Sequence, residues 1–216
     1  MNRLLTSTLL CLSLLTVTPL AVASEATTEV PKSLLQQIRE LLGLVQPVAA
    51  GGSRGSRTQV CLISPRLVPR SDTAVVSVPS PTIITSEPVN ELRLERDGQL
   101  LWRSVASSTA PVAARTPWPI APLQPGSTVE LVVRPRGASG GDLARIKLKV
   151  AAQDVLQANA AVIKKLSLNP QAWPSAFQSA LAKGDQSLAV ALLSSDVIPI
   201  DQKAQIQQTI QEASCK

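Results

Sequence analysis

The sequence predicts an α+β protein, in which an antiparallel immunoglobulin-like β-sandwich is followed by a small C-terminal helical hairpin or bundle. Short β-prone runs broken by proline fill residues 58–150, and the spacing of apolar residues changes from two to 3.6 after Val150. A turn signal, Asp97-Gly98, also joins two strand-like runs. Several short strands within about a hundred residues are typical of immunoglobulin-like sandwiches.

The chain begins with a segment typical of a secretory signal peptide. Arg3 precedes an apolar run from Leu4 to Leu20, and Ala21-Val22-Ala23 forms a small-residue cleavage motif. The alternative is an uncleaved membrane anchor, but the run is short and contains hydroxyl side chains and Pro19. We therefore expect residues 1–23 to be removed on export. The mature protein would be periplasmic or extracellular, and not transmembrane.

Residues 24–57 combine an amphipathic helix with a linker rich in glycine and proline. Apolar residues recur at helical spacing across Lys32–Leu44. Such a helix can lie on a membrane surface or pack on its own domain. We favour packing, because the polar face of the helix carries only two cations, Lys32 and Arg39.

Residues 58–150 form the predicted β-sandwich domain. The expected strands are Thr58–Ile63, Thr73–Val78, Pro81–Thr85, Glu91–Glu95, Gln99–Val105, Thr128–Arg134 and Leu143–Val150. In Thr128–Arg134 and Leu143–Val150, apolar and polar residues alternate. That pattern indicates strands with one buried face and one solvated face.

The turn at Asp97-Gly98 admits two loop lengths. A two-residue loop would place Leu92 opposite an arginine and scatter the apolar side chains. A three-residue loop, with Gly98 forming a G1 bulge, would pair Leu94 with Leu100 and Leu92 with Trp102. We predict the three-residue loop, because a one-residue slip moves side chains to the opposite face. Trp102 would then belong to the core.

Arg145, Lys147 and Lys149 share the solvent face of Leu143–Val150. Three cations in a row can contact an anion or a partner protein. More often, such a row is a solvated face or a device against edge-to-edge strand pairing. These three residues are the candidate partner-contact site of the sequence.

Residues 151–216 form the predicted helical domain, packed on the sandwich. The expected helices are Ala151–Leu166, Gln171–Lys183, Gln186–Ser194 and a fourth helix capped by Asp201. Between Gly51 and Val150 there are 13 Lys and Arg against 7 Asp and Glu, whereas residues 151–216 contain 5 of each. The basic segment could attract anionic glycans, lipid headgroups or acidic proteins. With few aromatic residues to stack on bases, we expect no nucleic acid partner.

The amino-acid composition excludes several catalytic classes. The chain contains no His, which rules out Ser-His-Asp and Cys-His catalysis and His-based zinc sites. The common serine-nucleophile motifs and the acidic clusters of calcium loops are also missing. Hydrolysis by a pair of carboxylates stays open, although the 15 acidic residues are scattered among cations. We expect no cofactor and no metal.

Two cysteines, Cys61 and Cys215, remain after signal cleavage. In an oxidising compartment they can form a disulfide, and closing so long a loop could contribute about 4 kcal/mol or more. The alternative is two free thiols. Neither cysteine has C-x-x-C or metal-ligand spacing.

Several short motifs together resemble a family of exported cyanobacterial proteins of unknown function. The motifs are Gly52-Ser53-Arg54-Gly55, Cys61-Leu62-Ile63-Ser64-Pro65, Leu101-Trp102, Leu123-Gln124-Pro125-Gly126 and a cysteine near the C-terminus. The resemblance covers roughly residues 51–216. It implies that Cys61 pairs with Cys215 and that the β and helical parts form one unit. It implies no catalytic residues, since its motifs are structural turns.

The sequence therefore predicts a non-enzymatic exported binding or scaffold protein that acts through protein–protein contacts. The alternative is a module that binds anionic glycans or the cell envelope through the basic strand Arg145–Lys149. A weaker third hypothesis is a carboxylate-dependent hydrolase, which requires two acids in reach of one cleft.

Overall fold

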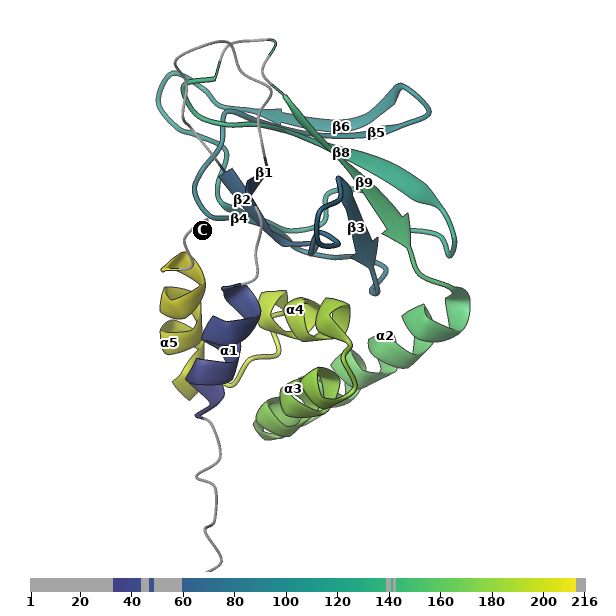
Figure 1. Ribbon diagram of the computed structural model, residues 1–216, viewed down its shortest axis with the longest axis vertical. Helices are drawn as coiled ribbons and strands as arrows, with labels where there is room; N and C mark the ends of the chain where they lie inside the picture. Colours follow the sequence, from purple (N-terminus) through teal and green to yellow (C-terminus); the bar gives the residue numbers. More distant parts are fainter. Residues whose placement is uncertain (1–32, 44–46, 49–59, 139–140, 142, 213–216) are drawn as a thin grey trace, which may run out of the picture. The chain divides into compact units, whose positions relative to one another are not determined.

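The computed structural model describes residues 33–43, 47–48, 60–138, 141 and 143–212. Residues 32–216 cluster into one compact unit. Strands come first and helices follow them, apart from one short helix that precedes the strands, so the α+β class is confirmed (Figure 1). The predicted signal peptide, most of the predicted linker and Cys215 lie outside the described residues.

All seven predicted strands are present, with ends shifted by a few residues. The described strands are β1 (Pro47–Val48), β2 (Val60–Ser64), β3 (Thr73–Val76), β4 (Ile83–Thr85), β5 (Glu91–Arg96), β6 (Gln99–Val105), β7 (Arg115–Thr116), β8 (Thr128–Arg134) and β9 (Ala144–Val150). The helices are α1 (Leu34–Leu42), α2 (Gln153–Leu168), α3 (Trp173–Ala182), α4 (Gln186–Ser194) and α5 (Ile200–Gln211), with a 3₁₀ turn at Pro170–Ala172. Strands β1 and β7 were not predicted, because two residues carry no periodic signal.

The strands form two sheets that share an aliphatic core. One sheet has the order β1-β2-β4-β7 and the other β3-β9-β8-β5-β6. All pairs are antiparallel except β3 with β9. The inner faces meet in one cluster that includes Leu62 and Ile83 from the first sheet and Leu94, Leu131 and Ile146 from the second. The alternation predicted for β9 is confirmed by its burial. In β8 it holds except at Val132, which is buried although it lies between the core residues Leu131 and Val133.

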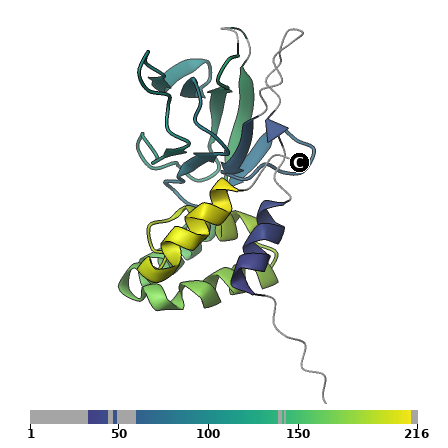
Figure 2. The same ribbon diagram turned by 90° about the vertical axis from the view of Figure 1, so that its left-hand side faces the viewer.

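Strand β2 is buried on both faces. Val60 and Leu62 join the core between the sheets, whereas Cys61 and Ile63 join a second core with the helices. Ile84 of β4 also faces the helices. The four-stranded sheet is therefore a middle layer, with the five-stranded sheet on one side and the helices on the other (Figures 1 and 2).

The helical core holds two of the few aromatic residues in the chain. Trp173 and Phe177 are fully buried and stack with ring centroids 5.3 Å apart. The Trp173 indole Nε1–H donates to the carbonyl of Leu192 at 3.2 Å, so the polar atom of the ring is satisfied inside the core. Helix α4 lies at the centre of this layer, and from Leu188 onward its residues are buried.

Helix α1 packs on its own unit, as we favoured from the sequence. Its apolar residues Ile38, Leu41 and Leu42 are buried in the helical core. Arg66 holds the C-terminal end of the helix, because its Nη1 donates to the Leu41 carbonyl at 2.8 Å. Burial lowers the pKa of the Arg66 guanidinium. The carbonyl end of a helix is a favourable place for such a cation.

Polar contacts also join the helices to the β part. Arg115 of β7 donates to the carbonyl of Ser194 at 2.6 Å, at the end of α4. The amide of Asn159 in α2 donates to the carbonyl of Ser77 at 3.1 Å. These contacts place donors against backbone carbonyls that would otherwise lose their water on burial.

Helix α4 has an acidic N-cap, whereas the predicted cap of α5 is corrected. Asp185 accepts the backbone N–H of Leu188 at 2.9 Å, as an N-cap should. Helix α5 begins after Pro199, so Asp201 lies in its first turn and not at the predicted cap position. The reason is that the Pro199 carbonyl already accepts the Lys203 N–H at 2.9 Å, which starts the helix two residues earlier.

The hairpin of β5 and β6 differs from the prediction. Both turn residues have positive φ, 51° at Asp97 and 76° at Gly98, which defines a two-residue loop. A bulge within β6 then absorbs one residue, so that Leu94 pairs with Trp102 and Leu100 lies opposite Glu95. The predicted pairing of Leu94 with Leu100 was therefore wrong. The predicted pairing of Leu92 with Trp102 is also wrong, since Leu92 pairs with Ser104. Trp102, which the sequence placed in the core, is partly buried and packs against it.

Candidate functional site

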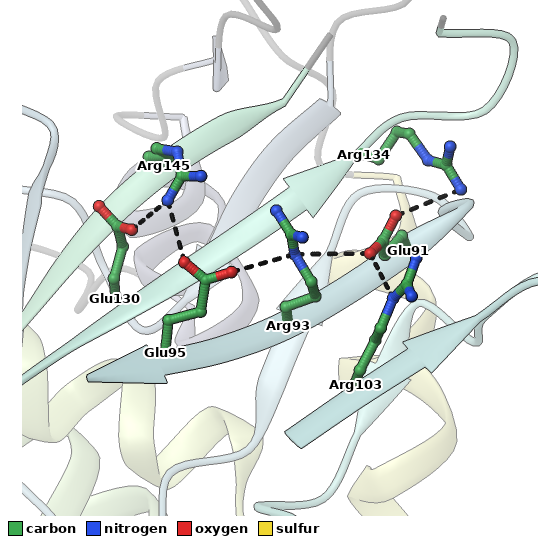
Figure 3. Close-up of polar contacts among 7 residues, drawn as sticks. All are labelled: Glu91, Arg93, Glu95, Arg103, Glu130, Arg134 and Arg145. Carbon is green, nitrogen blue, oxygen red and sulfur yellow. Dashed lines mark hydrogen bonds and ion pairs between the residues drawn. The ribbon is translucent and has the colours of Figure 1, made fainter. Parts of the chain in front are cut away.

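The outer face of the five-stranded sheet carries a chain of arginine–glutamate contacts. Because side chains alternate along a strand, Glu91, Arg93 and Glu95 of β5 point away from the core that Leu92 and Leu94 enter, and charged residues of β6, β8 and β9 lie on the same outer face. Figure 3 shows the contacts among seven of these residues, which are Glu91, Arg93, Glu95, Arg103, Glu130, Arg134 and Arg145. The described helices lie on the other side of the four-stranded sheet and leave this face uncovered (Figure 1).

At one end of this network, three arginines surround Glu91. Its side chain is 5% exposed, and its carboxylate accepts from Arg103 Nε at 2.7 Å. Arg134 Nη2 lies 3.2 Å from the same carboxylate, and Arg93 Nε lies 3.4 Å from it. The register explains the cluster, since Glu91 faces Arg134 on β8 while Arg93 faces Arg103 on β6. Three guanidinium groups around one carboxylate leave a local surplus of two positive charges, and we call this group the arginine cluster.

Arg145 is the centre of the other end. Its Nη1 donates to Glu95 at 3.1 Å and also to Glu130. These hydrogen bonds, that of Glu95 first, raise the pKa of Arg145. Arg93 lies 3.3 Å from Glu95 and so connects the two ends (Figure 3). At this end two guanidinium groups, those of Arg93 and Arg145, meet two carboxylates, so the local charges balance.

The residues predicted as a partner-contact site lie on this same outer face. Arg145 is engaged by two glutamates, and Lys147 Nζ lies 3.9 Å from Asp72. Lys149 is exposed. Strand β9 runs between β3 and β8, so it is an inner strand. Its cations therefore do not serve to prevent edge-to-edge pairing, which was one interpretation of the row.

A cavity of about 440 Å³ lies between the β3–β4 connection and helices α2 and α4. Its lining includes Pro79, Pro81, Lys164, Ser194 and Asp196. The Ser194 hydroxyl donates within its own helix, to the carbonyl of residue 191. Arg115 lies 3.4 Å from Asp196. Ser194 and Asp196 are therefore already engaged by other groups of the fold.

A second cavity, of about 250 Å³, lies at the tip of the β5–β6 hairpin and bears on the hydrolase hypothesis. Glu95, Asp97 and Glu130 line it, so three acids share one cleft. The carboxylates of Glu95 and Glu130 both accept from Arg145, however. Hydrolysis by a carboxylate pair needs one carboxylic acid that donates a proton to the leaving group. In this structure Glu95 and Glu130 instead share one guanidinium as hydrogen-bond acceptors.

Cys61 lies on the face of β2 that is covered by the helices, and it is 1% exposed. Its backbone N–H donates to the Ser86 hydroxyl at 3.0 Å. Ser86 in turn lines a small cavity together with Ile210 and Gln211, the last residues of α5. The chain thus leaves α5 close to Cys61, four residues before Cys215. Cys215 itself lies outside the described residues.

In the part of the chain that the structure describes, three or more His, Cys, Asp or Glu side chains nowhere gather in a way that could hold a metal ion. None of the described helices combines the length and apolar character that crossing a bilayer requires.

No protein-family model matches the chain, and no curated protein or solved structure is significantly similar to it. The resemblance to exported cyanobacterial proteins stays a prediction.

The arginine cluster was missed from the sequence, although a signal for it exists. Strand β5 reads Glu-Leu-Arg-Leu-Glu-Arg, which places Glu91, Arg93 and Glu95 on one face. What the sequence does not contain is the strand order. Arg134 and Arg103 reach Glu91 only because β8 and β6 lie on either side of β5.

Proposed function

We propose that this protein is a non-enzymatic exported binding or scaffold module that contacts partner proteins through the outer face of its five-stranded sheet. The observation that carries the proposal is the uncovered arginine–glutamate network of that face. The opposite side of the molecule is occupied by its own helices. A partner therefore has one broad sheet surface available to it among the described residues.

The network suits protein recognition for a physical reason. Arginine is enriched in protein interfaces, where its planar fork can bind carboxylates in a bidentate manner. Here Glu91 fixes the guanidinium groups of Arg93, Arg103 and Arg134 in place before any partner arrives. A side chain that is already ordered loses less conformational entropy on binding. Such a surface can bind with specificity and without catalysis.

We also propose that the two sheets form an immunoglobulin-like sandwich. The order β9-β8-β5-β6 corresponds to the G-F-C-C′ order of immunoglobulin variable-type sheets. In that scheme β4 and β7 would be strands B and E, and the first strand would be divided between the two sheets as β2 and β3. Domains of this architecture commonly act as binding modules at cell surfaces.

A disulfide between Cys61 and Cys215 is part of the proposal, because it follows from export into an oxidising compartment. The position of α5 near Ser86 supports it. The test is thiol labelling of exported protein, denatured without reductant. We expect neither cysteine to be labelled until a reductant is added. Labelling of both without reductant would contradict the disulfide.

The alternative partner is an anionic glycan bound by Arg145, Lys147 and Lys149. Its support is the exposure of Lys149 and the common face of the three cations. Against it, Glu95, Glu130 and Asp72 lie beside two of them and offset the local charge. A protein partner at the arginine cluster, where positive charge is in surplus, is the better supported hypothesis.

The test is capture of partners from exported fractions by chemical crosslinking, with two charge-reversal variants. Arg103→Glu changes the outer face, and Lys165→Glu makes the same change in charge on an exposed position of α2. We expect reproducible partners with the unchanged protein and with Lys165→Glu, and a clear loss with Arg103→Glu. A protein that captures no reproducible partner and instead turns over a substrate would contradict the proposal.

A further inference from the structure

Strand β6 is an open edge of the five-stranded sheet. It pairs with β5 on one side, and within the described residues nothing pairs with its other side (Figure 1). The opposite edge of the sheet differs. There β3 is only four residues long, and Leu67 forms an antiparallel bridge to Ala74 that covers part of it. The long edge available for pairing is therefore β6.

The exposed side chains of β6 are unusually apolar for an edge. Leu100, Leu101 and Val105 are 57%, 37% and 46% exposed, and they account for three of the seven exposed large apolar residues in the described chain. The strand contains no Pro and no Lys, two residue types that commonly protect sheet edges. A bulge near the hairpin turn leaves residues 102–105 as the regular part of the edge.

The direction of the backbone donors can be derived from one hydrogen bond. The Ala106 N–H donates to the Asn90 carbonyl at 2.8 Å, toward the β5 side. Because N–H groups alternate in direction along a strand, the N–H of Val105 points away from β5. The N–H of Arg103 points the same way. These two donors, and the carbonyls beside them, are available to an added strand.

The positive charge of Arg103 determines which side chain an added strand should place beside it. Arg103 of the arginine cluster lies on β6 and is 48% exposed, while the carboxylate of Glu91 beneath it is nearly buried. Arg103 uses its Nε for Glu91, which leaves the two terminal amino groups of its fork for another acceptor. A second copy of β6 could not supply this acceptor, because the strand has no acidic residue.

We propose that β6 binds an extended segment of a partner protein by strand addition, and that this segment carries an Asp or Glu, flanked by apolar residues, that contacts Arg103. Backbone hydrogen bonds would supply affinity, as in other cases of β-augmentation. The acidic residue would supply selectivity, since it meets the surplus charge of the arginine cluster. This inference rests on the proposed function and specifies its mode of recognition.

The test uses the full chain and labelled synthetic peptides, with binding followed by fluorescence anisotropy. The first probe is an eight-residue peptide of alternating Val and Thr with one central Asp. The second replaces that Asp by Lys, and the third carries N-methyl groups on alternate backbone nitrogens, which removes the donors that a strand needs. We expect binding of the first probe and at least about tenfold weaker binding of the other two.

Two variants at Val105 test backbone pairing, and a third variant, at Arg103, tests the side-chain contact. Val105→Pro removes an outward N–H at a position where an edge strand tolerates proline, and Val105→Thr retains that N–H. We expect Val105→Pro to weaken binding by about tenfold and Val105→Thr to leave it nearly unchanged. Thermal unfolding of both variants would show whether the fold is intact. Arg103→Ser should remove the preference for Asp over Lys.

The outcomes distinguish this inference from the proposed function. If Val105→Pro and the N-methylated peptide bind as well as their controls, strand addition is wrong. If no peptide binds while partners are still captured in an Arg103-dependent manner, the mode of recognition is wrong and the proposed function stands. If only a sulfated oligosaccharide binds, and Val105→Pro does not affect it, both are overturned in favour of a glycan site.

Discussion

The two sheets of this protein have opposite outer faces. The outer face of the four-stranded sheet is apolar, with Cys61, Ile63 and Ile84 buried under the helices. The outer face of the five-stranded sheet is lined by paired arginine and glutamate side chains, and no described helix covers it. The inner faces of both sheets are alike and aliphatic. One outer sheet face therefore packs against the helices of the protein, whereas the described helices leave the other uncovered.

The strand sequences differ in the same way. In β2 every position is buried, and its sequence Val-Cys-Leu-Ile-Ser shows no alternation in its first four residues. In β9 burial alternates at every residue, and its sequence Ala-Arg-Ile-Lys-Leu-Lys-Val alternates with it. A continuous apolar run thus marks a strand covered on both sides, whereas alternation marks one uncovered side. Substitutions on the two faces should accordingly differ in kind and in size.

The largest loss of stability should come from a substitution in the core between the helices and the four-stranded sheet. Trp173→Ala removes a fully buried ring that stacks on Phe177 and donates to the Leu192 carbonyl. We expect the free energy of unfolding to fall by about 3–5 kcal/mol, as for other buried aromatic residues replaced by Ala. The measurement is urea unfolding followed by circular dichroism.

The matched control for this variant is Leu168→Ala. Leu168 is also an apolar helical residue, but it is 82% exposed. Its replacement should change the free energy of unfolding by less than about 0.5 kcal/mol. Equal losses in the two variants would mean that the helices do not form a buried layer on the four-stranded sheet.

A smaller loss of stability should follow from removing one charge on the outer face of the five-stranded sheet. Glu91→Gln leaves three guanidinium groups without their shared carboxylate. Loss of one partner of a buried ion pair costs about 3–5 kcal/mol, and here solvent reaches Arg103, so we expect about 2–3 kcal/mol. The loss should shrink in Glu91→Gln,Arg103→Ser, because that double variant also removes one of the unpaired cations.

The control on the same face is Glu130→Gln. Glu130 is 30% exposed and contacts a single arginine, Arg145, that is itself 50% exposed. Its loss should cost at most about 1 kcal/mol. Both losses should be compared in chemical unfolding at low and high salt. If Glu130→Gln lowers the free energy of unfolding as much as Glu91→Gln does, the burial of Glu91 does not strengthen its ion pairs.

The strands and helices could be predicted because their periodicity is local. Strand β9 and helix α2 were located from spacing alone. The arginine cluster could not be located in this way, since it depends on which strands lie next to β5. The predicted register of the β5–β6 hairpin was wrong for a related reason. A bulge at Leu101 shifts the pairing by one residue, and nothing in the residues of β6 indicates that shift.

The smallest effect should come from the hairpin turn that positions β6 on the uncovered face. Gly98 has φ of 76°, and a Cβ placed there would meet no atom within 4 Å. Gly98→Ala should therefore cost about 1 kcal/mol through backbone strain alone. Gly141→Ala, at a glycine with no positive φ and equally open space, should be neutral. Both values come from thermal unfolding. If the two variants prove equal, the turn does not depend on its left-handed glycine, and the register of β6 must instead be set by the pairing of Leu94 with Trp102.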